Sequence, residues 1–210
     1  LKYLFILMKE FTTFFLLLVA VTIFYVYLET KALDVIYVKS DLVGKEPFNV
    51  LVRNLDDKQE AANLLAKIRE NLVKLVDYTS NEKNFKDNKE EYNEYKSALQ
   101  RMKNNFREDN ISESSPNNNY TSYSINKGEK IVFCIRSKKT GELVDLNTMM
   151  FVAIHEMGHL MSESVGHTQE FWKNMKYLLH RGEEINMYKH IDYSEDSVEY
   201  CGTMITDTPY

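Results

Sequence analysis

The hydrophobic residues are concentrated in the first thirty positions, where they form one continuous apolar stretch. Residues 11–28 read FTTFFLLLVAVTIFYVYL, eighteen residues without a charge, a proline or a glycine. A helix needs roughly 17–25 such residues to cross the hydrocarbon core of a bilayer. A cleaved signal peptide has a shorter apolar core and a small-residue cleavage site, whereas this stretch ends in bulky aromatic residues. The pattern therefore predicts an uncleaved, single-pass membrane anchor over residues 1–30, with an orientation that the few flanking charges leave open.

Apolar residues at helical spacing predict that residues 31–110 are mostly helical. Two short runs, DVIYV and FNVLV, have the composition of strands and come first. Apolar steps of three and four residues then predict helices over 56–78 and 90–107. The narrow apolar stripe of the second helix favours a helical hairpin with the first. The polar residues 108–119 that follow are typical of a linker.

The C-terminal half alternates between strand and helix patterns. The run KIVFCIRS at 130–137 predicts a strand, because its apolar residues alternate. A helix is expected over 146–165, ended by Gly166, which tolerates a left-handed backbone. Thr168 can cap the next helix, which we expect to stop at Gly182.

Charge and cysteine content narrow the possible functions. The formal net charge of −5 comes without a basic cluster, so a nucleic-acid-binding surface is not indicated. The chain has two cysteines, Cys134 and Cys201. They could form one disulfide in an oxidising compartment, or remain two buried thiols, and the sequence does not decide between these alternatives.

The first predicted helix of the C-terminal half contains the pattern HExxH, as His155, Glu156 and His159. Residues four apart on a helix lie on one face, so both imidazoles can bind one zinc ion at about 2.0–2.1 Å. Glu156 lies beside them and can act as a general base on a water molecule held by the metal. The helix places these residues opposite an apolar face, so we expect the histidines to point away from the packed side.

A catalytic zinc site has three protein ligands and one open position, so a third ligand is needed. His167 is the leading candidate, because Gly166 allows the chain to turn back after the helix. The alternatives are acidic residues or histidines downstream of the motif: Glu163, His180, Glu183, Glu184 and His190. The longer HExxHxxGxxH pattern is absent, because position 162 is Ser and position 165 is Val, which excludes a metzincin by that signature.

Two segments, HEMGH at 155–159 and SVGHTQEFW at 164–172, resemble the WLM and SprT-like group of zinc metallopeptidases. In that group a third histidine follows HExxH and lies just before a Phe/Trp pair. More narrowly, SYSINKG at 122–128, the Cys-x-Arg at 134–136 and YCG at 200–202 are similar to WLM-like proteins of giant DNA viruses. The resemblance covers about residues 120–210.

This resemblance implies an α+β, zincin-like metallopeptidase domain over residues 120–210, with Zn²⁺ as cofactor and a protein or peptide as substrate. Some members of the group cleave proteins crosslinked to DNA. The acidic balance and the predicted anchor depart from that role, so nucleic acid is not expected as a partner. The anchor would then lie in a viral membrane or an internal membrane of the host.

Two further functions stay open: a membrane-tethered zinc-binding domain without turnover, and a soluble protease that acts near nucleic acid once the apolar N-terminus is removed. For a peptidase, the strand at 131–136 could bind an extended substrate by β-strand addition. Tyr188, His190 and Tyr193 are candidates for an oxyanion donor. Phe171 and Trp172 are expected to pack the last helix against the helix that carries HExxH.

Overall fold

A computed structural model describes residues 2–31, 34–42, 48–116, 118 and 120–209. The chain divides into two compact units, Leu1–Asp34 and Val35–Tyr210. The first unit contains the helix α1 (Lys2–Lys31). Its segment Met8–Leu28 is long and apolar enough to cross a membrane, and none of it is buried. The apolar N-terminal stretch of the sequence is therefore one uninterrupted helix.

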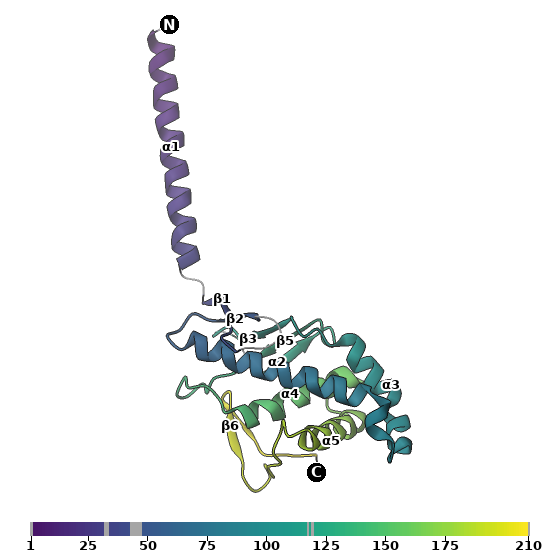
Figure 1. Cartoon of the computed structure of the whole chain (residues 1–210). Helices are drawn as coiled ribbons and strands as arrows, with labels where there is room; N and C mark the ends of the chain where they lie inside the picture. Colours follow the sequence, from purple (N-terminus) through teal and green to yellow (C-terminus); the bar gives the residue numbers. More distant parts are fainter. Residues whose placement is uncertain (1, 32–33, 43–47, 117, 119, 210) are drawn as a thin grey trace. The chain divides into compact units, whose positions relative to one another are not determined.

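The second unit is built on a five-stranded mixed sheet with the order β1-β2-β3-β5-β4 (Figure 1). Its strands are β1 (Val35–Lys39), β2 (Asn49–Arg53), β3 (Ile111–Glu113), β4 (Tyr123–Ile125) and β5 (Lys130–Phe133). β1 and β2 are antiparallel, β3 is parallel to both β2 and β5, and β4 is antiparallel to β5. The combination of this sheet with separate helices is an α+β architecture, as expected.

The central strand β3 lies inside the segment 108–119, so the prediction of a linker there is wrong. Ser112 and Glu113 are both only 3% exposed. Glu113 is buried because its carboxylate accepts hydrogen bonds from the Nε of Arg136, at 2.7 Å, and from the backbone N–H of Arg53, at 2.7 Å. A charged residue can occupy a buried strand when it is paired and hydrogen-bonded in this way.

Both edges of β5 are occupied, by β3 on one side and β4 on the other. The expectation that residues 131–136 bind substrate by strand addition is therefore wrong, because β-strand addition needs a free edge. β4 is the edge strand on this side of the sheet, and its outer edge pairs with no other strand in the described part of the chain.

The helices of the second unit pack against the sheet and against one another (Figure 1). They are α2 (Lys58–Ser80), the short 3-10 helix η1 (Glu82–Phe85), α3 (Lys89–Asn105), α4 (Leu146–Met161) and α5 (Gln169–Glu184). Helix α2 contacts β1, β2 and β3 on one side and α4 on another, and α4 contacts α3 and α5. The described part of the region 31–110, which leaves out residues 32–33 and 43–47, thus contributes two strands, two α-helices and one 3-10 helix to the same compact unit as α4.

Neither α4 nor α5 ends at the glycine expected from the sequence: α4 ends before Gly166, and α5 continues past Gly182. α4 ends at Met161, where the extended backbone of Ser162 and its hydroxyl, which donates to the carbonyl of Gly158 at 2.8 Å, close the helix. Gly166 has a positive φ of 83° but lies in the following loop. α5 continues through Gly182, where the absence of a side chain lets Ile154 and Tyr188 pack close to the backbone.

A small hairpin of β6 (Val198–Tyr200) and β7 (Thr203–Ile205) follows α5. Its two-residue loop, Cys201 and Gly202, has positive φ angles of 51° and 82° at both positions, the signature of a type I′ turn. Cys201 forms a disulfide with Cys134, which follows β5. The two cysteines, whose state the sequence left open, therefore tie the hairpin to the end of the central sheet.

Candidate active site

Helix α4 brings His155 and His159 to one side. The helix begins at Asp145, whose carboxylate accepts a hydrogen bond from the backbone N–H of Thr148 at 3.0 Å. The two imidazole rings lie with their centroids 5.0 Å apart, as the four-residue spacing predicts. We expected α4 to have one exposed face that carries the histidines. In the structure, twelve of its sixteen residues are buried, so the helix is enclosed on most sides.

The loop between α4 and α5 returns His167 to these two histidines. The Nε2 atoms of His167 and His155 are 3.0 Å apart, and one ring nitrogen from each of the three histidines lies within 4.8 Å of the others. Ligand nitrogens at zinc distances in a tetrahedral site are separated by about 3.3 Å, so the donors are of the kind that zinc prefers and the pair His155–His167 is close to this separation. They form a group that could hold a metal ion.

The other sequence candidates for the third ligand have partners elsewhere. Glu163 pairs with Arg101, and Glu183 lies 3.5 Å from Nδ1 of His190. The Glu184 carboxylate accepts a hydrogen bond from the hydroxyl of Tyr78 at 3.1 Å. Within the described residues, no cluster of three potential metal ligands includes any of them.

Burial keeps the two helix histidines neutral, which is the form that binds a metal. Desolvation, with the nearby histidines adding a smaller effect, lowers the pKa of His155 to about 3. Desolvation likewise lowers the pKa of His159 to about 4. Phe171 lies against all three imidazoles, with ring centroids 4.3–4.8 Å away. Gly158 makes room for this ring, because a Cβ at that position would come within 3.1 Å of it.

Glu156 is almost fully buried, with 3% of its surface exposed. Desolvation raises the pKa of its carboxyl to about 7, and hydrogen bonds from the side chain and backbone of Ser124 oppose that shift. Ser124 lies on the edge strand β4. A carboxylate with a pKa near neutrality, at the side of three potential zinc ligands, is suited to accept and return a proton.

Comparison with known proteins agrees with this arrangement. The family model of the WLM domain matches residues 94–208, more than half of the chain. The chain belongs to the WLM-domain family. It is also 35% identical to the uncharacterized protein R325 of Acanthamoeba polyphaga mimivirus over 192 residues, which are 91% of this chain and 92% of that protein.

Two shorter similarities are to proteins of invertebrate iridescent viruses. The uncharacterized protein 136R of Invertebrate iridescent virus 6 is 38% identical over 32% of this chain and 38% of its own length. The uncharacterized protein 042R of Invertebrate iridescent virus 3 is 41% identical over 24% of this chain and 31% of its own length. No solved structure is significantly similar to the chain. The expected relation to WLM-like proteins of DNA viruses is thus confirmed.

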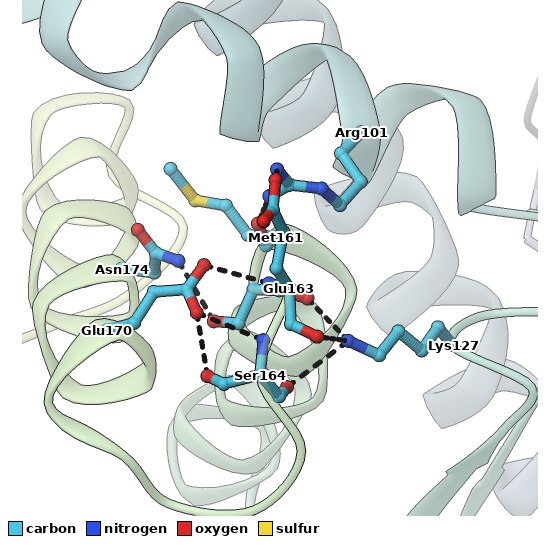
Figure 2. A network of polar contacts seen from close by, with 8 residues as sticks. Arg101, Lys127, Met161, Glu163, Ser164, Glu170 and Asn174 are labelled. Carbon is cyan, nitrogen blue, oxygen red and sulfur yellow. Dashed lines mark hydrogen bonds and ion pairs between the residues drawn. The ribbon is translucent and has the colours of Figure 1, made fainter.

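A polar network fixes the loop that carries His167 in this WLM domain (Figure 2). The ammonium group of Lys127 donates to three successive backbone carbonyls, those of Ser162 at 2.7 Å, Glu163 at 2.5 Å and Ser164 at 3.1 Å. Lys127 comes from the turn between β4 and β5, where its own φ is 53°. A cation at the C-terminal end of a helix is favoured electrostatically and satisfies carbonyls that the helix leaves unpaired.

Glu170 holds the same loop from the other side (Figure 2). Its carboxylate accepts hydrogen bonds from the backbone N–H of Glu163 at 2.8 Å, and from the N–H and hydroxyl of Ser164 at 3.0 and 2.6 Å. Arg101 of α3 donates to the carbonyl of Met161 at 2.5 Å and pairs with Glu163. These contacts join α3, the β4–β5 turn and α5 to the loop that orients the third histidine.

Tyr188, His190 and Tyr193 were expected as donors to an oxyanion. None of them is among the described residues that line the cavity containing His155 and Glu156. Tyr193 and Tyr188 instead pack against Phe151. Tyr200, which the sequence analysis did not select, lines that cavity. Its hydroxyl lies 2.5 Å from the Oγ of Ser122, and burial raises its pKa well above the usual value, so the phenol stays protonated.

Proposed function

We propose that this protein is a membrane-anchored, zinc-dependent peptidase. The observation that carries the proposal is the convergence of three imidazole nitrogens within 4.8 Å of one another, with the buried carboxyl of Glu156 directly beside them in the sequence. Membership of the WLM-domain family, which is associated with zinc-dependent proteases, supports the same reaction class. His155, His159 and His167 are the proposed metal ligands.

When bound, zinc supplies a Lewis acid that acidifies a water molecule and polarises the scissile carbonyl. Glu156 accepts the proton of the attacking water on its carboxylate and delivers it to the nitrogen of the leaving amine. Ser124 holds the carboxylate in place through its hydrogen bonds. Tyr200, which remains protonated, is a second donor at the same cavity and can bind an oxygen of the substrate.

The edge strand β4 is the proposed binding site for the substrate backbone. Its outer edge is unpaired among the described residues, and Ser124 in its middle reaches Glu156. An extended peptide that adds to this edge would therefore run past the general base.

Helix α1 is the proposed anchor. Its span Met8–Leu28 is wholly exposed, and its large apolar side chains would face lipid. A signal sequence near the N-terminus would have a similar composition, so the proposal depends on retention of this helix in the mature protein.

The proposal is tested by measuring zinc content and peptide cleavage on the full-length chain in detergent. Wild-type protein should bind one zinc ion and cleave members of an unstructured peptide library. Glu156→Gln should keep the metal and lose about 10²–10⁴-fold in rate, because only the proton acceptor is removed. His167→Ala should lose zinc affinity as well as activity. The exposed Glu90→Gln, on α3 and outside the cavity of the site, is the matched control and should retain both the metal and most of the rate.

Zinc binding without cleavage of any library peptide by the wild type would contradict the peptidase assignment. That result would leave the chain as a tethered zinc-binding domain.

A further inference from the structure

Beside the histidine cluster lies a cavity of about 250 Å³. His155 and Glu156 are among the residues that line it. Most of its other lining side chains are apolar, and these come from α4, α5 and β7. Any peptide bond held at the proposed general base would therefore have this cavity next to it. The inference that follows rests on the proposed function of the same site.

The inner part of this cavity is formed by buried apolar side chains. Phe151 and Val152 of α4 are 5% and 7% exposed, and Met175 of α5 is fully buried. The outer part is formed by Trp172 of α5 and by Met204, which is 50% exposed. Half-exposed apolar groups next to a buried apolar floor would gain by contact with an apolar group of a ligand.

The hairpin β6–β7 forms one wall of the cavity and is fixed at three points. Its turn is bound covalently by the Cys134–Cys201 disulfide. Glu199 accepts a hydrogen bond from the hydroxyl of Ser137 at 3.0 Å, and the hydroxyl of Tyr200 contacts Ser122. A wall held in this way is already in place before a ligand arrives, which reduces the entropic cost of binding.

Charge at the cavity disfavours one class of side chain. The exposed Asp207 is one of the residues that line the cavity. An acidic side chain that enters the cavity would meet the like charge of this carboxylate and lose hydration, whereas an uncharged apolar side chain would not meet that repulsion.

We propose that this cavity binds a large apolar side chain of the substrate next to the scissile peptide bond, and that the hairpin β6–β7, through Met204, is the element that sets this specificity. The proposed substrates are therefore protein segments with residues such as Leu, Met or Phe at that position.

A binding experiment tests the proposal without turnover. Three peptide hydroxamates, which anchor on zinc, carry an isobutyl, an aminobutyl or a carboxymethyl side chain beside the chelating group. Zinc-loaded full-length protein should bind the isobutyl compound at least about tenfold more tightly than the carboxymethyl compound, as expected for an apolar subsite. Trp172 is the only tryptophan in the chain and lines the cavity, so its fluorescence should shift when the isobutyl compound binds.

The variant Met204→Glu should reverse the order of the isobutyl and aminobutyl compounds, of which the wild type binds the isobutyl compound more tightly, because it adds a carboxylate to the cavity. Leu55→Glu is the matched control: Leu55 is 40% exposed and lies outside the cavity, so the order should stay as in the wild type. Equal binding of all three compounds, an unchanged Trp172 signal, or an unchanged order in Met204→Glu would each overturn the proposal.

The two proposals fail in different ways. Cleavage of library peptides without a preference for apolar residues would overturn the subsite and leave the peptidase intact. A hydroxamate preference without any cleavage would overturn the peptidase and leave the apolar subsite. Failure to bind zinc would overturn both.

Discussion

Helices α1 and α4 are both strongly apolar, but their polar groups are satisfied in opposite ways. In α1 the hydroxyls of Thr12, Thr13 and Thr22 each donate to the carbonyl four residues earlier, at 2.7–2.8 Å. In α4 the side chain of Asn147 instead bonds to the backbone of Lys189, at 2.9 and 2.7 Å, and the HExxH histidines meet a third imidazole from outside the helix.

This difference separates a helix that can stand alone from one that depends on its neighbours. Apolar surroundings without protein partners require that polar groups be satisfied within the helix, as the three threonines of α1 are. Helix α4 takes its partners from α5, from β4 and from the loops around them, so its chemistry exists only in the folded unit. Apolar composition alone does not distinguish the two cases, whereas the partners of the polar residues do.

The same substitution, alanine to aspartate, can be made in α4 and in α1, and we expect the larger effect in α4. Ala153 of α4 is fully buried, and Ala153→Asp would place a carboxylate in the apolar core without a group positioned to pair with it. We expect a loss of about 4 kcal/mol or more in the free energy of unfolding, enough to unfold many domains. Denaturant unfolding of the full-length chain in detergent, followed by circular dichroism, measures this loss. A stability within about 1 kcal/mol of the wild type would contradict the assignment of this face to the core.

The corresponding change in α1 should affect a different property. Ala20 is exposed and lies within the proposed span, so Ala20→Asp should cost about 2.5–3.5 kcal/mol of membrane insertion and leave the unfolding of residues 35–210 unchanged. Carbonate extraction of membranes measures the retained fraction, with Leu55→Glu as the control. Equal retention of the variant, or a mature N-terminus beyond residue 28 by mass spectrometry, would contradict the anchor.

The sequence predicted the elements whose partners are close along the chain. The four-residue step from His155 to His159, the apolar run around it and the cap at Thr168 are local features, and the structure has each of them: Thr168 accepts the N–H of Phe171 at 3.3 Å. His167 was selected by residue type and by its place after a glycine. The structure brings it to the other two histidines, although the turn is made by the whole loop.

Features whose partners are distant along the chain were not predictable. The segment that contains β3 was predicted as a linker because its composition is polar, and the partner that allows Glu113 to be buried, Arg136, lies 23 residues further on. Lys127 was part of a recognised segment, but the carbonyls it binds are 35–37 residues away. Tyr200 has no local feature that distinguishes it from Tyr188 or Tyr193. Pairings of this kind depend on tertiary structure, which spacing and propensity do not encode.

The loop after α4 depends on Lys127 for the position of His167. A substitution of Lys127 therefore tests how far the site depends on contacts from outside α4. Lys127→Ala removes three hydrogen bonds from the His167 loop, and we expect zinc affinity to fall about 10–100-fold, as for other residues that orient metal ligands. Competition with a chromophoric chelator measures this affinity, and the visible spectrum of the cobalt-substituted protein reports the ligand geometry.

Two variants separate this positioning role from a loss of folding. Lys74→Ala is the matched control, since Lys74 makes only a surface pair with Glu70, and it should leave zinc affinity unchanged. Lys127→Arg keeps the charge and should recover part of the affinity. An unchanged zinc affinity in Lys127→Ala, with an unchanged cobalt spectrum, would show that the loop is held without this contact.

The smallest effect is expected from Glu170, whose contribution depends on pH. Hydrogen bonds from the hydroxyl of Ser164 and then from the N–H groups of Glu163 and Ser164 lower the pKa of Glu170 from 4.5 to about 2. A lowered pKa means that the folded protein favours the ionised form, so the stabilisation is present above about pH 4.5 and is lost as the pH falls toward about 2. The group is close to solvent, so screening should keep the effect below about 1 kcal/mol. Thermal unfolding between pH 6 and pH 3 should therefore show a slightly steeper loss of stability for the wild type than for Glu170→Gln, and parallel curves would mean that the carboxylate does not hold the loop.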